Sequence, residues 1–210
     1  MAQILNFPVQ PSKLGYKRAK RRAGRARDVN QLDLFPAPEA QILHLESGLS
    51  RFDQALMLDE RGEPGAAADL YAKAIAEQDC PADAYCNLGI IESRNGNTMR
   101  AFDCFTASLK HNPRQAEAHY NLGNLYFELN DFRLAQTHYE MAAEIDPALV
   151  NVYFNLALIQ AINNDFSAAI VALGKYRESV SEEEGRVAEE LLQNLKQSWT
   201  AVKSPRLAST

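Results

Sequence analysis

The chain has 210 residues, 46% of them hydrophobic, which is enough for one domain with a hydrophobic core. Its three cysteines, Cys80, Cys86 and Cys104, form no Cys-x-x-Cys pair, which argues against a disulfide framework or zinc site and favours a reducing, cytoplasmic setting. The net charge of −5 is divided unevenly, since residues 1–30 carry +7 and the remainder carries −12.

The first predicted element is an arm, residues 1–38, which we expect to be disordered because it is rich in proline and basic residues. Its cations could contact nucleic acid, since a basic run neutralises phosphates without reading bases. In a eukaryotic protein the run could be a nuclear localisation signal. It could also keep the chain soluble, or lie on the acidic remainder and regulate it. The candidate nucleic-acid contacts are Lys17, Arg18, Lys20, Arg21, Arg22, Arg25 and Arg27.

A second feature of the arm is the pentapeptide Gln31, Leu32, Asp33, Leu34 and Phe35. It resembles the peptide by which bacterial DNA polymerases and repair proteins dock on the sliding clamp. In such a peptide the glutamine supplies a directional hydrogen bond, and the apolar side chains fill a pocket. The resemblance predicts a clamp-docking motif if the source is bacterial. The alternative is that the apolar residues pack against the first repeat or into the protein's own groove.

Beyond the arm, the same residue types return every 34 positions, which indicates a repeat protein. Gly or Asn ends each first helix, because these residues adopt the left-handed C-cap conformation most readily. A column of small residues lets the two helices of a hairpin approach, and a column of mostly aromatic residues fills the space beside it. The columns are Gly62, Gly96, Asn130 and Asn164; Ala67, Ala101, Ala135 and Ala169; and Tyr71, Phe105, Tyr139 and Leu173.

This pattern resembles the tetratricopeptide repeat family, whose signature is matched by Asn121, Leu122, Gly123, Tyr126, Ala135, Tyr139, Ala142 and Pro147. The resemblance implies an all-α helical solenoid over residues 39–181, with repeats at about 48–81, 82–115, 116–149 and 150–181. A capping-box pattern at 181–184 and an apolar stripe predict a helix over 182–203 that covers the last repeat. A tail, 204–210, follows.

By the same resemblance, defined positions of the first helices line a concave groove. Asn87, Asn121 and Asn155 share one such position, and each could pair with the N–H and C=O of an extended peptide. The alternative is that they satisfy polar groups of neighbouring helices. Some family members bind a terminal carboxylate through basic residues here, but this chain has aromatic residues instead, so we expect an apolar or basic peptide. The candidate groove residues are Phe52, Asn87, Ile90, Tyr120, Asn121, Asn124, Phe127, Phe154, Asn155 and Leu158.

Catalytic patterns are missing from the sequence. The four histidines have no metal-ligand spacing and no Gly-rich phosphate loop occurs, so we expect no enzyme, cofactor or metal. The longest uncharged stretch, 147–164, contains five amide side chains, which argues against a membrane span. The leading interpretation is a non-enzymatic scaffold or adaptor for partner proteins or peptides. The alternative is a DNA-associated accessory protein that uses the basic arm and the clamp motif.

Overall fold

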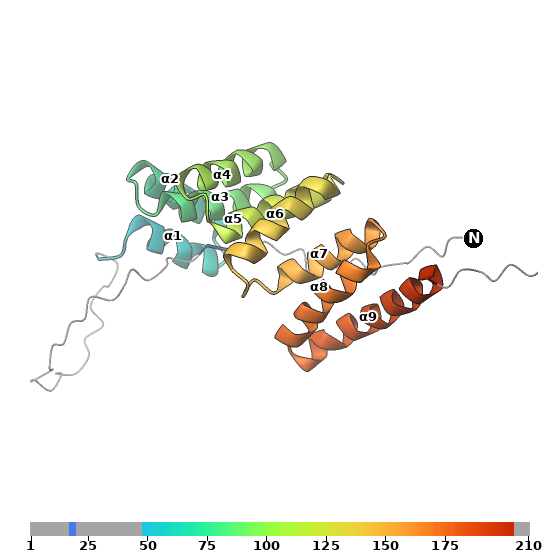
Figure 1. Ribbon diagram of the computed structural model, residues 1–210. Coiled ribbons are helices and arrows are strands. Elements are labelled where there is room, and N and C mark those ends of the chain that lie inside the picture. Colours follow the sequence, from blue (N-terminus) through green and yellow to red (C-terminus); the bar gives the residue numbers. More distant parts are fainter. Residues whose placement is uncertain (1–16, 20–47, 204–210) are drawn as a thin grey trace, which may run out of the picture. The chain divides into compact units, whose positions relative to one another are not determined.

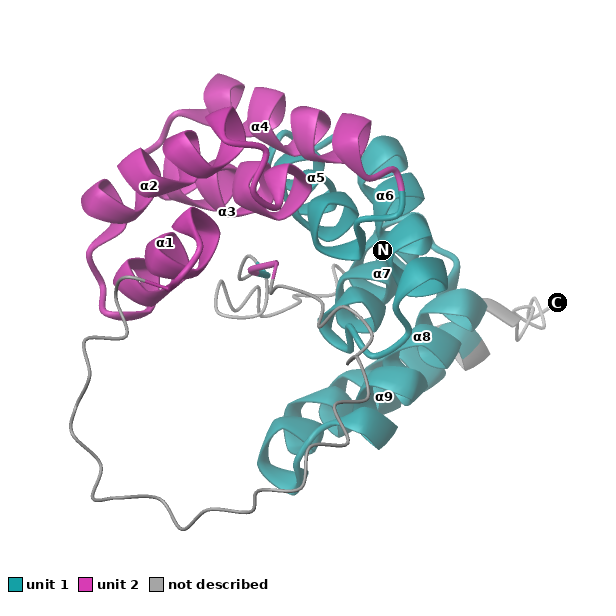
Figure 2. Ribbon diagram, turned by 90° about the vertical axis from the view of Figure 1, so that its left-hand side faces the viewer, with its two compact units in different colours: residues 1–17, 114–210 teal, residues 18–113 magenta. Residues whose placement is uncertain are grey.

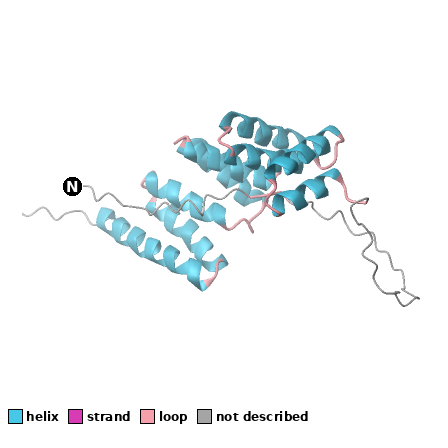
Figure 3. Cartoon of the chain, turned by 180° about the vertical axis from the view of Figure 1, so that it is seen from behind, coloured by secondary structure: helices cyan, strands magenta, loops and turns pink. Residues whose placement is uncertain are grey.

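The computed structural model describes residues 17–19 and 48–203, and the regular secondary structure within these ranges is entirely α-helical (Figure 3). Four helical pairs follow one another, and a longer helix closes the described chain (Figure 1). The helices are α1 (Arg51–Glu60), α2 (Pro64–Ala76), α3 (Pro81–Arg94), α4 (Thr98–His111), α5 (Ala116–Glu128), α6 (Phe132–Ile145), α7 (Asn151–Ile162), α8 (Phe166–Ser179) and α9 (Glu182–Lys203). The expected all-α class is confirmed.

None of the helices in the described ranges combines the length and the apolar character needed to cross a membrane.

The turns inside the four helical pairs have the left-handed backbone that the sequence predicts. The φ angles are 82° at Gly62, 77° at Gly96, 61° at Asn130 and 62° at Asn164. Glycine has no Cβ to clash in this region, and asparagine tolerates the region better than most residues. The repeated column therefore closes each first helix at the same point and returns the chain as the second helix of the pair.

The chain divides into two compact units, shown in different colours in Figure 2. The described residues of unit 2 are 18–19 and 48–113, which include α1 to α4. Each helix in this unit packs on the next one in sequence. The core contains Phe52 and Tyr71, whose ring centroids lie 5.8 Å apart, together with small residues such as Ala67.

The described residues of unit 1 are 17 and 114–203, which include α5 to α9. Its helices again pack in sequence order, and α9 lies against α8. Ala188, Leu191, Leu192 and Leu195 of α9 join the hydrophobic core of this unit. The helix begins after Ser181, whose hydroxyl oxygen lies 3.4 Å from the Glu184 backbone nitrogen, as in a capping box.

Glycine permits close contact between the two helices of a pair. In unit 2, a Cβ on Gly89 would lie 2.7 Å from Cε1 of Phe105. In unit 1, a Cβ on Gly123 would lie 2.5 Å from Cε1 of Tyr139. The last repeat has Ala157 at the glycine position and Leu173 at the ring position. Where the ring position holds the smaller leucine, the glycine position on the facing helix therefore holds the larger alanine.

Candidate peptide-binding site

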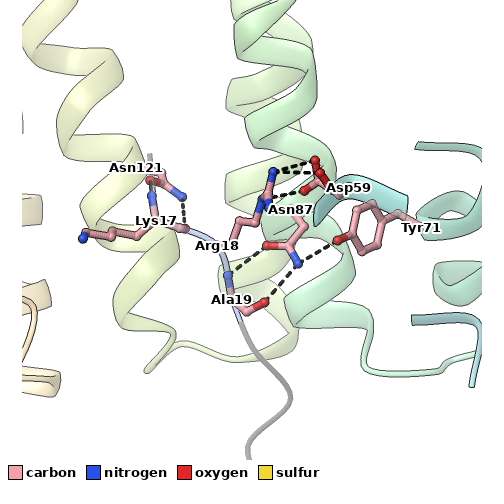
Figure 4. Close-up of polar contacts among 7 residues, drawn as sticks. All are labelled: Lys17, Arg18, Ala19, Asp59, Tyr71, Asn87 and Asn121. Atoms are coloured by element: carbon pink, nitrogen blue, oxygen red, sulfur yellow. Dashed lines mark hydrogen bonds and ion pairs between the residues drawn. The ribbon is translucent and has the colours of Figure 1, made fainter. Parts of the chain in front are cut away.

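In unit 2, the Asn87 side chain on α3 holds the backbone of Ala19 by two hydrogen bonds (Figure 4). The Ala19 N–H donates to Oδ1 of Asn87 at 2.8 Å, and Nδ2 of Asn87 donates to the Ala19 carbonyl at 3.0 Å. Nδ2 also donates to the Tyr71 hydroxyl at 3.2 Å. This third bond fixes the orientation of the carboxamide, so that its oxygen and nitrogen face the two backbone groups of Ala19.

In unit 1, Asn121 on α5 makes the same pair of bonds to Lys17. The Lys17 N–H donates to Oδ1 of Asn121 at 2.9 Å, and Nδ2 donates to the Lys17 carbonyl at 3.0 Å. Asn87 and Asn121 are both fully buried. Two positions one repeat apart therefore hold peptide backbone by the same chemistry.

The paired bonds show the local conformation of the held segment. One carboxamide reaches the N–H and C=O of a single residue only when both groups point to the same side, as they do in an extended strand. A helical residue directs these groups in opposite directions along the helix axis. Lys17 and Ala19, which are two residues apart, are therefore each held in an extended conformation.

Between these two residues, the Arg18 side chain reaches Asp59 in the last turn of α1 (Figure 4). Nε of Arg18 lies 2.6 Å from Oδ2 of Asp59, and one terminal nitrogen donates to Oδ1 at 2.7 Å. The same nitrogen donates to the Asp59 carbonyl at 3.3 Å. The ion pair thus includes one hydrogen bond to the carboxylate, while Nε and Oδ2 lie in close contact without the geometry of a hydrogen bond.

Asp59 is held in a poorly solvated position. Its side chain is 2% exposed, whereas that of Arg18 is 26% exposed. Burial raises the pKa of the Asp59 carboxyl above its ordinary value, while the charges of Arg18 and Arg94 act in the opposite direction. The charged carboxylate therefore depends on nearby cations, and Arg18 contacts it directly.

Asn155, the third asparagine of the column, has a different environment. Its Nδ2 donates to Oδ1 of Asn124 at 3.3 Å and to the Tyr120 hydroxyl at 3.4 Å. Its Oδ1 is buried and makes no hydrogen bond within the part of the chain that the structure describes. The Tyr139 hydroxyl donates to Oδ1 of Asn124 at 2.7 Å. Both asparagines thus join a buried network inside unit 1, which is the alternative that the sequence left open.

The expected aromatic pockets are filled by neighbouring rings of the same repeat. Phe52 packs on Tyr71, Tyr120 on Tyr139, and Phe154 on Tyr176 at a centroid distance of 5.2 Å. The rings of Phe52, Tyr120 and Phe154 are buried, as are Ile90 and Leu158, and Phe127 is half-buried against Phe132. These residues build the repeats, whereas Asn87 and Asn121 make hydrogen bonds to the described part of the arm.

Most residues of the two linear features lie outside the described ranges. This applies to Lys20, Arg21, Arg22, Arg25 and Arg27, and to the whole segment Gln31–Phe35. Docking on a sliding clamp therefore stays a prediction. Of the candidate nucleic-acid contacts, Lys17 and Arg18 are described: Asn121 holds the Lys17 backbone, and Asp59 engages the Arg18 guanidinium.

Asp59 is not among the residues predicted from the sequence, although two signals point to it. Asp59 occupies the same repeat position as Phe127, which the family resemblance assigns to the groove. It also lies in the last turn of α1, where a helix disfavours negative charge; this turn has no basic residue, and Arg61 follows it as the C-cap. An acid at such a place indicates that a cation comes from elsewhere in the chain or from a ligand.

Residues 116–149 match the family model described as tetratricopeptide repeat, and they span α5 and α6 with the adjoining turns. The chain is also similar to tetratricopeptide repeat protein 8 of Mus musculus, at 32% identity over 94 residues. The human protein of that name is 31% identical over 94 residues. These matches cover 45% of this chain but only 18% and 17% of the two relatives. The likeness thus covers less than half of this chain and a small part of each relative.

Solved structures with a similar fold include a crystal structure of MamA, with a TM-score of 0.54 at 21% identity, over 64% of this chain and 81% of that one. The first TPR domain of Spaghetti (RPAP3) bound to an HSP90 peptide gives 0.51 at 18% identity, over 57% and 93%. At these identities the likeness shows the fold alone. The matched repeat at residues 116–149 and the recurring turn residues agree with this likeness, so that the chain contains a tetratricopeptide repeat and has the fold of such repeats.

Proposed function

We propose that this protein is a non-enzymatic adaptor that holds an extended peptide segment by its backbone. The fold is that of a protein-interaction scaffold. The observation that supports a peptide ligand is the paired hydrogen bonding of Asn87 to Ala19 and of Asn121 to Lys17. Two buried carboxamides in equivalent repeat positions each satisfy both backbone groups of one residue.

Backbone recognition suits an adaptor because every non-proline residue offers the same N–H and C=O. Main-chain hydrogen bonds then supply affinity, and side-chain contacts select among sequences. One of the solved neighbours, the Spaghetti domain, is bound to a peptide, which agrees with this use of the fold. A bound partner would replace residues 17–19, since both would need the same carboxamide atoms.

The test uses the full chain with its own arm kept away from the site. Arginine precedes alanine at 18–19, 22–23 and 25–26, so the variant R18E/R22E/R25E removes all three positions at which the arm could dock in the same way. A fluorescent peptide of residues 13–21 is then added, and its anisotropy is measured. We expect saturable binding, which is lost in the same protein carrying Asn87→Ala and Asn121→Ala.

Asn95→Ala is the matched control, because Asn95 is exposed and directly follows α3. This control protein should bind the peptide as the parent does. If the parent variant binds no peptide although its circular dichroism spectrum is helical, the proposed function is wrong. If the double asparagine variant binds as well as the parent, the assignment of the two carboxamides is wrong.

A further inference from the structure

We infer that the site in unit 2 selects an arginine followed by a small residue, with Asp59 as the receptor for the guanidinium and residues 18–19 as an internal copy of that ligand. This inference rests on the proposed function and adds the chemistry of the partner. The recognised element is an extended segment in which the small residue pairs with Asn87 and the arginine just before it reaches Asp59.

The contacts of Arg18 require a guanidinium rather than any cation. Two of its nitrogens face the two oxygens of the Asp59 carboxylate, and one of these nitrogens also reaches the Asp59 carbonyl. A lysine ammonium is a charge at a single nitrogen, so it cannot place one nitrogen against both Oδ1 and the carbonyl of Asp59 and a second nitrogen beside Oδ2. An Arg-to-Lys exchange in the ligand therefore keeps the charge but loses the contacts that need two nitrogens of one planar group.

The end of α1 adds a second attraction for the guanidinium. The carbonyl groups at a helix C-terminus carry partial negative charge, and a basic residue in the last turn commonly offsets it. The last turn of α1 has no basic residue, and the Arg18 guanidinium donates to a carbonyl there. The bound arginine thus supplies positive charge to both the carboxylate and the helix end.

The next residue of the ligand must be small. Ala19 is 0% exposed although it belongs to the arm, and Asn87 holds both its backbone groups. A longer side chain would need space that this enclosed position does not offer while the backbone stays in place. Alanine, glycine and serine meet this requirement, whereas leucine does not.

The arm contains this element more than once. Arginine precedes alanine at Arg18-Ala19, Arg22-Ala23 and Arg25-Ala26. The acidic remainder of the chain, at −12, also favours a basic ligand over long range. A partner with the same element would compete with the arm for Asp59 and Asn87. The partner would therefore bind only at a concentration high enough to displace the arm.

The experiment compares peptides of residues 13–21 on the full-length R18E/R22E/R25E protein by fluorescence anisotropy. The Arg18→Lys peptide has the native charge, and we expect it to bind about tenfold more weakly, because a hydrogen bond between charged groups is lost. The Ala19→Leu peptide should bind at least about tenfold more weakly because of its size. The Lys13→Ala peptide controls for charge and should lose much less affinity than the Arg18→Ala peptide, which has the same net charge.

Asp59→Asn in the same protein tests the receptor. Its affinity for the native peptide should fall about tenfold, as for the Arg18→Lys peptide on the parent protein. On the protein that carries Asp59→Asn, replacing Arg18 of the peptide by alanine should cost little more, since the partner group is already absent. Circular dichroism and thermal unfolding show whether the variant is folded, and the peptide variants give the same information without altering the protein.

The outcomes separate the two proposals. Equal binding of the native, Arg18→Lys and Ala19→Leu peptides, with binding still dependent on Asn87 and Asn121, would overturn the selectivity but support the peptide-binding function. A loss that is the same for Lys13→Ala and Arg18→Ala would overturn Asp59 as the receptor and leave only long-range attraction. If none of the peptides binds, the proposed function itself fails.

Discussion

Tyr139 of α6 packs directly on Gly123 of α5, so closely that a Cβ on the glycine would lie 2.5 Å from Cε1 of the ring. The ring is fully buried and its hydroxyl donates to Asn124. Because the hydroxyl is held at one end and the ring rests on the helix backbone, Tyr139 has little freedom to move away. The glycine is therefore required by the shape of this helix pair.

Gly123→Ala should lower the free energy of unfolding by about 1–3 kcal/mol, the usual cost of overpacking a core. Gly174→Ala is the matched comparison, because nothing lies within 4 Å of a Cβ at this position in α8. It should raise the stability by about 0.5–1 kcal/mol, since alanine favours a helix over glycine. Urea unfolding measures both, and equal effects of the two substitutions would contradict the packing argument.

Contacts that repeat with the 34-residue period could be predicted from the sequence. The left-handed turns at Gly62, Gly96, Asn130 and Asn164 follow from residue types with a known backbone preference. The contact of Gly123 with Tyr139 likewise joins two columns whose spacing is constant. Local rules suffice in such cases because each repeat contacts mainly its neighbours in sequence.

Asn155 should contribute to stability rather than to peptide binding. Its amide nitrogen bonds to Tyr120 and Asn124 in the buried network of unit 1. Asn155→Ala should lower the free energy of unfolding by about 1 kcal/mol, as expected for the loss of neutral hydrogen bonds. The binding of the 13–21 peptide to the R18E/R22E/R25E protein should not change. A loss of peptide affinity as large as that of Asn121→Ala would instead place Asn155 in the binding site.

The imidazole of His138 in α6 is held in its neutral form. Its Nδ1 lies 3.1 Å from Nδ1 of His119 in α5, and the Tyr126 ring stacks on it at a centroid distance of 5.4 Å. Burial lowers the pKa of His138 to about 4, and the neighbouring His119 acts in the same direction. In a hydrogen bond between the two Nδ1 atoms one ring donates and the other accepts, so the two imidazoles cannot both be protonated while the bond is kept.

Stability should therefore fall as the pH decreases from about 6.5 to about 4, because the unfolded chain binds a proton at His138 in this range and the folded chain does not. His138→Gln removes this linkage. Urea midpoints at pH 7 and pH 5 should differ less for the variant than for the native protein. The same pH dependence in both proteins would show that His138 is not responsible.

The binding of residues 17–19 to Asn121 and Asn87 could not be predicted from the sequence in the same way. Asn87 bonds to a residue 68 positions away and Asn121 to one 104 positions away, so no local rule connects the partners. A carboxamide that binds backbone atoms also places no restriction on the side chains of its ligand, so no sequence pattern marks the segment that it binds. The position of the asparagines was predictable from the repeat, but the identity of their occupant required the fold.

The role of the aromatic candidates was not predictable for a related reason. Phe52, Tyr120 and Phe154 lie at positions assigned to the groove by the family resemblance, yet each packs on a tyrosine of the second helix. The same repeat column can face a ligand or the hairpin core, depending on how large its neighbours are. The repeat period shows which residues occupy equivalent positions. It does not show whether they face a ligand or the core of the helical pair.

Amide hydrogen exchange by NMR in the native full-length protein tests the central claim most directly. The backbone amides of Lys17 and Ala19 should exchange at least about tenfold more slowly than in the free 13–21 peptide, because each donates to a buried carboxamide. Asn87→Ala should remove the protection of Ala19, and Asn95→Ala should not. Exchange of both amides at the rate of the free peptide in the native protein would contradict the account.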